Sequence, residues 1–409
     1  MTKKVQLFSS IPLLMYQMPH LSSFVLGIWI RHGSRHEPPS KNGLSHFIEH
    51  LFFQGTQKRD ASAISYEIDN LGGELNAFTS REFTVLYVKV LSKYMIEAIE
   101  LLGDIFSNPL FNEVEIEKER AVILDEIRTV RDTPDELIHD IFMEQAFLNG
   151  LGQPILGKED TVSRIEKPDI LECFKAYYAT TNSIISCTGN FDERSLIGCL
   201  EKNLVFRSSN QTLSINPPKF SSSINVFEKN LSEVHLSLGI DTFPFKSSYR
   251  FPLLLLNCII GGSVSSKLFQ EIREKRGLVY NIYSYVSFYS DTGLFEIYTA
   301  CDAKKVNEIL SIIKDVLRTL PDTITAEELE RAKRQTSSQI LFSLESPSAI
   351  MHNLAYQELY TGETFDSNEY LKNIEKVGLD DLKSVANFLR DKSPAITLLG
   401  SIKREEIDF

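Results

Sequence analysis

Two histidines and a glutamate stand within five residues near the start of the chain, in the order His46-Phe47-Ile48-Glu49-His50. On a helix, four residues make about one turn, so the imidazoles of His46 and His50 share a face and can bind the same metal ion. Glu49 is placed roughly 100° around the helix from His50, where its carboxylate can reach a zinc-bound water. This is the order of the inverted zinc-peptidase motif, and it predicts metal-assisted hydrolysis of a peptide bond.

The same five residues are compatible with a surface helix whose two histidines are solvated. The flanks argue against that interpretation, because Phe47, Ile48, Leu51, Phe52 and Phe53 make the segment strongly apolar. Histidines among such residues are costly to bury unless something binds them, and a metal ion is the simplest partner.

A catalytic zinc site needs a third protein ligand, and two histidines with one glutamate form a standard set. The segment 115–128 offers this ligand, since Val122, Ile123 and Ile127 give an apolar stripe of helical period. Glu119 and Glu126 are seven residues apart and share a face, so one can bind the metal while the other supports it. Without the histidines, a solvated charged helix would be the simpler interpretation.

Long motifs extend this pattern at residues 43–56 (GLSHFIEHLFFQGT), 72–82 (GGELNAFTSRE), 119–127 and 268–280 (LFQEIREKRGLVY). Together they resemble the pitrilysin/insulinase family of zinc metallopeptidases, in particular its half-length bacterial branch similar to mitochondrial processing peptidases. The resemblance runs nearly end to end. One departure is Gln54, where many relatives carry lysine, and it touches no catalytic role.

The resemblance implies a role for each residue of the motif. His46, His50 and Glu126 would bind one Zn²⁺ per chain, Glu49 would be the general base, and Glu119 would support the ligands from a second layer. The protein would then be a zinc-dependent endopeptidase that hydrolyses peptides or unfolded segments held in an enclosed chamber.

Substrate contacts are expected in two places. Arg273 and Tyr280 match the family's Arg/Tyr pair, which sits opposite the zinc and can donate to substrate carbonyls and to the developing oxyanion. The Gly72-Gly73 turn permits a sharp bend, and the strand after it can accept an extended peptide through main-chain hydrogen bonds; a plain internal hairpin is the alternative. The residues expected nearest to the peptide are Asn76, Ala77, Phe78 and Thr79.

The chain also repeats itself at an offset of 211 residues, which aligns Thr84 with Phe295 and Glu119 with Glu330. In this register the positions of His46, Glu49, His50 and Glu126 are taken by Asn257, Ile260, Gly261 and Ser337, so the second half cannot bind zinc in the same way. We expect an α+β fold of two homologous domains, each a mainly antiparallel sheet packed with helices.

A polar stretch that includes a Pro-Pro pair divides the two halves and is typical of a surface linker. We expect a zinc-binding domain at 1–206, the linker at 207–223, and at 224–409 a domain without zinc that supplies the Arg/Tyr pair. Alternating apolar residues predict strands at 84–90 and 295–301, and amphipathic patterns predict helices at 96–106 and 306–317.

Composition excludes several classes of protein. A net charge of −12 argues against nucleic acid as a partner, and no apolar run approaches the ~20 residues that span a bilayer. Pro12 and polar residues interrupt the N-terminal stretch, so we expect no cleaved signal peptide and a cytoplasmic location. The five cysteines are odd in number and unpaired in spacing, which indicates reduced, mostly buried thiols.

The remaining polar residues suggest no second site. The stretch 31–36 (RHGSRH) is expected to be a solvated loop leading to the histidine helix. His139, His235 and His352 stand alone and are expected to be structural histidines with satisfied hydrogen bonds.

The resemblance implies a homodimer in which each zinc site faces the second domain of the partner chain, although completion of the site within one chain stays open. The alternative is a non-catalytic or scaffold subunit of the same family that pairs with an active chain. A zinc hydrolase acting on something other than peptides is a third hypothesis. The complete set of His46, Glu49, His50 and Glu126 favours the peptidase.

Overall fold

The computed structural model describes residues 2–8, 10–209, 211, 213 and 215–408. The chain forms two compact units, the first made of Met1–Thr129, Gln153–Asn216 and Ser343–Asp366, the second of Val130–Gly152, Pro217–Phe342 and Ser367–Phe409. Of the expected linker, Asn210, Thr212 and Ser214 lie outside the described residues, as do Met1, Ser9 and Phe409. The domain division at 207–223 stays a prediction.

The first unit is built on a six-stranded sheet with the order β1-β2-β6-β3-β5-β4, in which only the β2–β6 pair is parallel. Its strands are β1 (Thr2–Leu7), β2 (Ile11–Gln17), β3 (Ser23–Ile30), β4 (Glu74–Thr79), β5 (Thr84–Leu91) and β6 (Ser183–Gly189). Its helices are α1 (Leu44–Leu51), α2 (Ala61–Asn70), α3 (Met95–Ser107), α4 (Glu113–Asp132, ending in the second unit), α6 (Glu159–Arg164), α7 (Lys167–Tyr177), α8 (Glu193–Asn203) and α12 (Pro347–Thr361).

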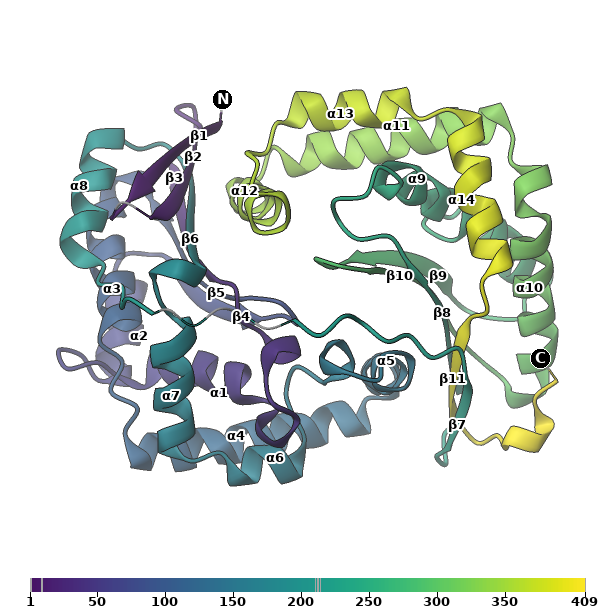
Figure 1. The fold of residues 1–409 in the computed structure, drawn as a ribbon, viewed down its shortest axis with the longest axis horizontal. Coiled ribbons are helices and arrows are strands. Elements are labelled where there is room, and N and C mark those ends of the chain that lie inside the picture. Colours follow the sequence, from purple (N-terminus) through teal and green to yellow (C-terminus); the bar gives the residue numbers. More distant parts are fainter. Residues whose placement is uncertain (1, 9, 210, 212, 214, 409) are drawn as a thin grey trace. The chain divides into compact units, whose positions relative to one another are not determined.

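Both faces of this sheet are buried, as the central strand β3 shows. Phe24, Leu26 and Ile28 point into the core that contains residues of α1 and α3. The alternate residues Gly27 and Trp29 meet α12, which comes from far along the chain (Figure 1). A Cβ atom at Gly27 would lie 2.5 Å from the sulfur of Met351, so only glycine permits this close approach.

The second unit repeats this plan with a five-stranded sheet in the order β7-β11-β8-β10-β9, in which only the β11–β7 pair is parallel. Its strands are β7 (Ile224–Glu228), β8 (Val234–Thr242), β9 (Ile282–Phe288), β10 (Gly293–Cys301) and β11 (Ala395–Gly400). Its helices are α5 (Pro134–Ala146), α9 (Arg250–Ile260), α10 (Val306–Thr323), α11 (Ala326–Ser343), α13 (Ser367–Lys376), α14 (Leu379–Asp391) and a π-helix at Phe269–Glu274.

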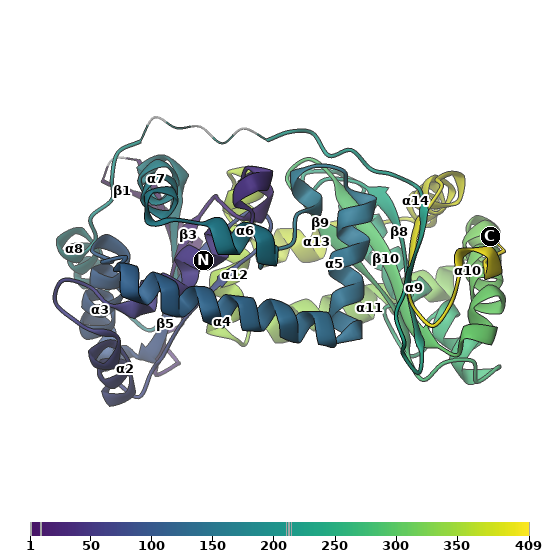
Figure 2. The same cartoon turned by 90° about the horizontal axis from the view of Figure 1, so that it is seen from below.

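One face of this second sheet packs against α9, α10 and α14, and the other face packs against α5 (Figure 2). Leu238 and Phe295 belong to the first of these cores, whereas Leu294 and Phe142 belong to the second. Gly239 lies beneath α5, where a Cβ atom would come within 2.4 Å of the Phe142 ring. Each sheet is therefore covered on one face by a helix from the other half of the sequence.

These units confirm the expected α+β class with two mainly antiparallel sheets packed with helices. The four elements predicted from periodicity are β5, β10, α3 and α10, with ends shifted by up to six residues. The five cysteines are free and four of them are buried, as their number and spacing indicate. Among the described residues, no helix combines the length and apolar character needed to cross a membrane.

Candidate metal centre

Helix α1 separates its packing residues from its polar ones. Gly43 precedes it with a φ of 98°, in the left-handed region that favours glycine. The buried apolar residues follow the i, i+3, i+4, i+7 spacing and join the core of the first unit: Leu44, Phe47, Ile48 and Leu51. This packing fixes the rotation of α1, and with it the directions in which His46, Glu49 and His50 project.

Three side chains of the first unit converge where the sequence predicts a metal. Glu126 Oε2 lies 3.6 Å from His46 Nε2 and 3.6 Å from His50 Nε2. One ligand atom from each of the three residues lies within 4.8 Å of the others. Ligand atoms at the usual zinc distances, arranged as a tetrahedron, are about 3.3 Å apart, close to the 3.6 Å between Glu126 Oε2 and each Nε2 atom.

The hydrogen bonding at this point also fits a metal ion. Glu126 Oε2 is buried yet has no hydrogen-bond partner in the described part of the chain. A buried carboxylate oxygen without a partner is unfavourable, and a cation between it and the two imidazoles would remove that penalty. The donor set is therefore suited to a divalent ion such as zinc.

Helix α4 supplies both glutamates of this centre. Ile116 and Ile123 of α4 are buried in the core, which turns Glu119 and Glu126 toward α1. Glu119 Oε2 lies 2.9 Å from His50 Nδ1, on the opposite side of the ring from the atom that faces Glu126. A carboxylate bonded to the second ring nitrogen orients a histidine ligand and strengthens it as a donor.

The charges around the two imidazoles differ. Burial, with a smaller contribution from neighbouring His50, lowers the pKa of His46 to about 4. Burial alone would lower the pKa of His50 too, but the carboxylates of Glu119 and Glu126 outweigh it and raise that pKa to about 9. The carboxylates of Glu119 and Glu126 thus stabilise positive charge beside His50.

Glu49 also lies on α1, and its carboxylate is hydrogen-bonded to a residue of β4. The hydroxyl of Thr79 on β4 donates to Glu49 Oε2 at 2.6 Å. Burial raises the pKa of the Glu49 carboxyl, and the hydrogen bond from Thr79 partly opposes this rise. The carboxylate is therefore held in one orientation and is more basic than an exposed glutamate.

Strand β4, which carries the predicted peptide contacts, is an edge strand of the first sheet, and within the described part of the chain it pairs with β5 alone. Ala77 and Thr79 point to the α1 side, whereas Phe78 points to the other face and stacks on His352 with ring centroids 5.4 Å apart. The side chain of Asn76 accepts from the Ala77 N–H at 2.8 Å. The strand is thus available for main-chain pairing, while its role in binding peptides stays a prediction.

Arg273 and Tyr280 belong to the second unit. The Arg273 guanidinium lies 4.6 Å from the ring centre of Phe269 and 5.6 Å from that of Tyr280. Tyr280 is 86% exposed. The two side chains are neighbours, as a pair that acts together requires, and their catalytic role stays a prediction.

The stretch 31–36 corrects one expectation from the sequence. We expected a solvated loop, but His32, Ser34 and Arg35 are buried. His32 stacks on Tyr177 with ring centroids 4.2 Å apart, and the Arg35 guanidinium forms a buried ion pair with Glu82 at 2.7 Å. The polar sequence suggested exposure to solvent, because Tyr177 and Glu82, which pack against or pair with these residues, lie far away along the chain.

Two of the three isolated histidines have the hydrogen-bond partners expected of structural histidines, and the third packs against an aromatic ring. His139 Nδ1 lies 2.8 Å from the buried carboxylate of Glu296, and His235 Nδ1 lies 2.8 Å from the Tyr298 hydroxyl. His352 packs edge-on against Trp29. These contacts are those of structural histidines.

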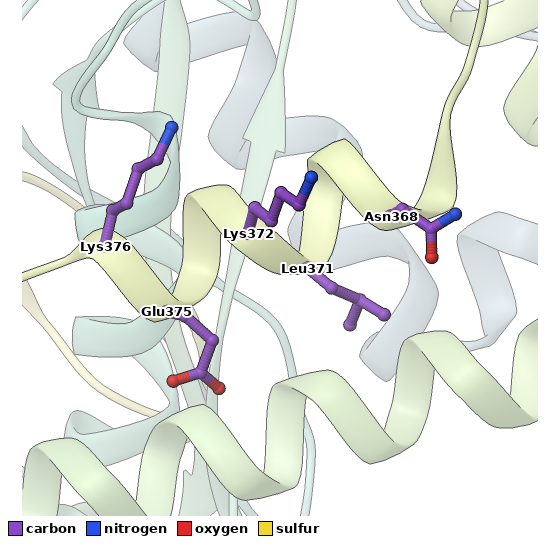
Figure 3. A pocket seen from close by; sticks show the side chains of 5 residues that line it. All are labelled: Asn368, Leu371, Lys372, Glu375 and Lys376. Carbon is purple, nitrogen blue, oxygen red and sulfur yellow. The ribbon is translucent and has the colours of Figure 1, made fainter.

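A cavity of about 670 Å³ lies along α13 in the second unit. In Figure 3, Leu371 and Glu375 point toward a neighbouring helix, while Lys372 and Lys376 project away from it. One helix supplies all five lining residues, the fifth being Asn368, and no metal-ligand set converges among them. The candidate site is therefore the centre on α1 and α4.

Comparison with known proteins shows which family the chain resembles. A family profile described as insulinase (peptidase family M16) matches residues 15–159, and one described as the peptidase M16 inactive domain matches residues 164–336. The chain is 34% identical over 402 residues to the uncharacterized zinc protease YmxG of Bacillus subtilis (strain 168), covering 98% of both chains. It belongs to peptidase family M16.

Two further M16-like proteins show how far the likeness extends. An uncharacterized zinc protease of Streptomyces coelicolor is 33% identical over 405 residues, which cover 95% of this chain and 87% of the relative. A crystal structure of a peptidase M16 inactive domain from Pseudomonas fluorescens has a TM-score of 0.91 at 19% identity, covers 98% of both chains and thus shares the fold. The relatives of this M16 chain are named zinc proteases and have about its length, as expected for the half-length branch.

Proposed function

We propose that the protein is a zinc-dependent endopeptidase whose metal ligands are His46, His50 and Glu126. The observation that carries this proposal is the meeting of the two Nε2 atoms with Glu126 Oε2 at 3.6 Å, where that oxygen has no other partner among the described residues. Membership of family M16 and the zinc protease names of its relatives support the same activity.

When bound, zinc supplies a Lewis acid that lowers the pKa of a coordinated water to about 7 and polarises the scissile carbonyl. Glu49 accepts the proton of the attacking water at its carboxylate and passes it to the leaving amine nitrogen. The Thr79 hydroxyl holds that carboxylate in place, and Glu119 orients the ring of His50. Arg273 and Tyr280 donate to a substrate carbonyl and to the oxyanion.

The proposed substrate is an extended peptide. Strand β4 has one unpaired edge, so a peptide can add to it through main-chain hydrogen bonds that do not depend on sequence. Asn76, Ala77, Phe78 and Thr79 would then lie next to the bound segment. Main-chain recognition of this kind predicts broad specificity among unfolded segments.

The proposal includes a homodimer, which the resemblance to the family implies. The zinc ligands belong to the first compact unit and the Arg/Tyr pair to the second, so two copies can complete each other's sites. Mixing Glu49→Gln chains with Tyr280→Phe chains should restore part of the activity through hybrid dimers. Sedimentation of a monomer, or no gain on mixing, would favour a site completed within one chain.

The function is tested by measuring bound metal and the cleavage of an internally quenched peptide, with and without a chelator. We expect about one zinc per chain and cleavage that chelation removes and added zinc restores. Zinc binding without cleavage of any peptide in a random library would instead favour a non-catalytic subunit, which the match of the second half to an inactive-domain profile makes worth testing. Cleavage that survives metal removal would exclude the proposal.

A further inference from the structure

The helix that carries two of the three proposed zinc ligands has no capping side chain of its own. Helix α1 is eight residues long, and its N-cap residue is Gly43. The first N–H groups of any helix lack partners within it, and a helix of two turns is marginal by itself. Because His46 lies in the first turn of α1, fraying there would displace a proposed ligand directly.

Glu37, six residues before Gly43, supplies the missing acceptors. Its Oε1 atom accepts from the N–H of Ser45 at 2.6 Å. Its Oε2 atom accepts from the N–H of Gly43 at 2.7 Å and from the side-chain amide of Asn42 at 3.0 Å. The carboxylate therefore bonds to the backbone immediately before His46.

This carboxylate is buried, with 4% of the residue exposed. Burial raises the pKa of Glu37, and the hydrogen bonds from Ser45, Gly43 and Asn42 oppose that rise. A buried carboxylate is unfavourable unless hydrogen bonds and nearby positive charge compensate it, and the positive end of a helix dipole provides both. The N–H groups of α1 thus hold Glu37, and Glu37 in turn holds them.

The segment around Glu37 is itself fixed. The side-chain amide of Gln153 donates to the backbone carbonyls of Glu37 and Ser34 at 3.0 and 2.9 Å. The buried ring of His32 lies 3.0 Å from the Ser45 hydroxyl through its Nδ1 atom. Two different residues of the buried loop therefore reach Ser45, one residue before the first proposed ligand.

The second half of the chain provides a natural control. At the offset of 211 residues Glu37 corresponds to Ser248, and the segment 242–249 (TFPFKSSY) that leads to α9 contains no acidic residue. Helix α9 carries none of the proposed ligands and runs for eleven residues without an acidic cap. The buried acid accompanies the short helix that bears the histidines.

We propose that Glu37 is a positioning residue that clamps the N-terminus of α1 and thereby aims His46 and His50 at Glu126. It acts through the backbone of Gly43 and Ser45 and touches neither metal nor substrate. The inference rests on the proposed zinc site and adds to it the residue that fixes its geometry.

The test compares Glu37→Gln with Glu82→Gln in the full-length chain. Glutamine keeps the shape of Glu37 but offers one acceptor oxygen, so an N–H of α1 would face an amide NH₂. Glu82 is a matched control, because it is also a buried carboxylate of the first unit but pairs with Arg35. Zinc affinity is measured by competition with a chromophoric chelator, and amide hydrogen exchange of residues 43–51 is measured on metal-free chains.

We expect Glu37→Gln to weaken zinc binding by about tenfold or more and to speed exchange in residues 43–51. Glu82→Gln should change neither zinc affinity nor exchange in residues 43–51, even if it lowers Tm as much as Glu37→Gln does. Unchanged exchange and affinity in Glu37→Gln would overturn the inference, as would an equal effect in Glu82→Gln. A wild-type chain that fails to bind zinc would refute the proposed function instead, and exchange in the metal-free chains would still decide whether Glu37 holds the helix.

Discussion

The two halves of this chain use one scaffold for different ends. In the first half, α1 presents His46 and His50 to Glu126. In the second half, the two histidine positions are taken by Asn257 of α9 and by Gly261, the residue directly after α9. Asn257 Oδ1 accepts from the Ser284 hydroxyl at 2.7 Å, so this position serves an internal hydrogen bond. The apolar pattern of helix and sheet thus maintains the fold, while a few polar residues decide whether a half can bind a metal.

Giving the first half a residue of the second should have the largest effect. We expect His46→Asn, which copies Asn257, to reduce zinc from about one ion per chain to near zero and to abolish peptide cleavage, because two ligands are too few for a stable site. Metal analysis after dialysis measures the first effect and a quenched-peptide assay the second. Full zinc content in this variant would remove His46 from the ligand set.

A smaller effect is expected where the metal stays and only the proton acceptor is lost. Glu49→Gln, at the position aligned with Ile260, should retain zinc yet lower kcat by about 10²–10⁴-fold, the usual contribution of a general base. Glu117→Gln, which changes an exposed glutamate of α4, is a control for loss of a glutamate. Turnover near the wild-type value would exclude Glu49 as the base.

The repeat offers a direct control for the supporting glutamate. Glu119 aligns with Glu330 on α11, and in the second half Gly261 takes the position of His50. We expect Glu119→Gln to weaken zinc binding by about 10–100-fold and Glu330→Gln to leave it unchanged. Chelator competition measures both, and equal affinities in the two variants would contradict the role of Glu119.

In each half a glycine of the sheet allows a helix to pack closely on it, and substitution of these glycines tests that packing. We expect Gly27→Ala and Gly239→Ala each to destabilise the protein by about 1–3 kcal/mol, since the new methyl would meet Met351 or the Phe142 ring at 2.5 or 2.4 Å. Gly198→Ala in α8, with no atom within 4 Å of its would-be Cβ, should stabilise by about 0.5–1 kcal/mol. Urea unfolding measures the free energy of unfolding of all three variants. An unchanged value for Gly239→Ala would show that α5 does not pack closely on its sheet.

The smallest expected effect concerns pH. Burial holds the pKa of His32 well below its ordinary value of 6.5, so His32 is neutral in the folded chain and takes up a proton in the unfolded chain below about pH 6.5. Stability is therefore lost as pH falls below 6.5, by up to about 1.4 kcal/mol per pH unit. His32→Phe, which copies Phe243 of the second half, should flatten this dependence.

Tm values of metal-free protein between pH 7.5 and 5.5 measure the effect, with His20→Gln as the exposed control. At pH 7.5 His32→Phe should be less stable than the wild type by about 1 kcal/mol, because the Ser45 hydroxyl loses its hydrogen-bond partner. Parallel profiles for wild type and His32→Phe would mean that His32 does not contribute to acid sensitivity.

The sequence predicts best what depends on local periodicity. The spacing of His46 and His50, and of Glu119 and Glu126, places each pair on one helix face, and the buried residues between them decide which face turns inward. Their convergence on a shared point was therefore foreseeable, whereas their roles as ligands stay predictions. The burial of His32 and Arg35 was not foreseeable, because Tyr177 and Glu82 approach them only in the folded chain.

The same reason hid the two helices, α5 and α12, that each cover one face of a sheet from the other half of the sequence. Nothing in the sequence of α12 indicates that Trp29 lies beneath it, since more than three hundred residues separate them. The acceptor role of Glu37 was equally hidden, because capping is normally sought at the residue directly before a helix. Sequence reasoning thus finds elements and motifs more readily than the distant partners that hold them.

The placement of α5 and α12 bears on how such a protein can evolve and be engineered. A fragment ending before residue 207 would retain the histidines but lose α12, leaving Trp29 and its neighbours in water. A fragment beginning at residue 224 would lose α5 and uncover Leu294 in the same way. The duplicated halves therefore cannot be exchanged as independent modules. Recombination that replaces one half with that of a relative must also transfer the helix from the other half that covers its sheet.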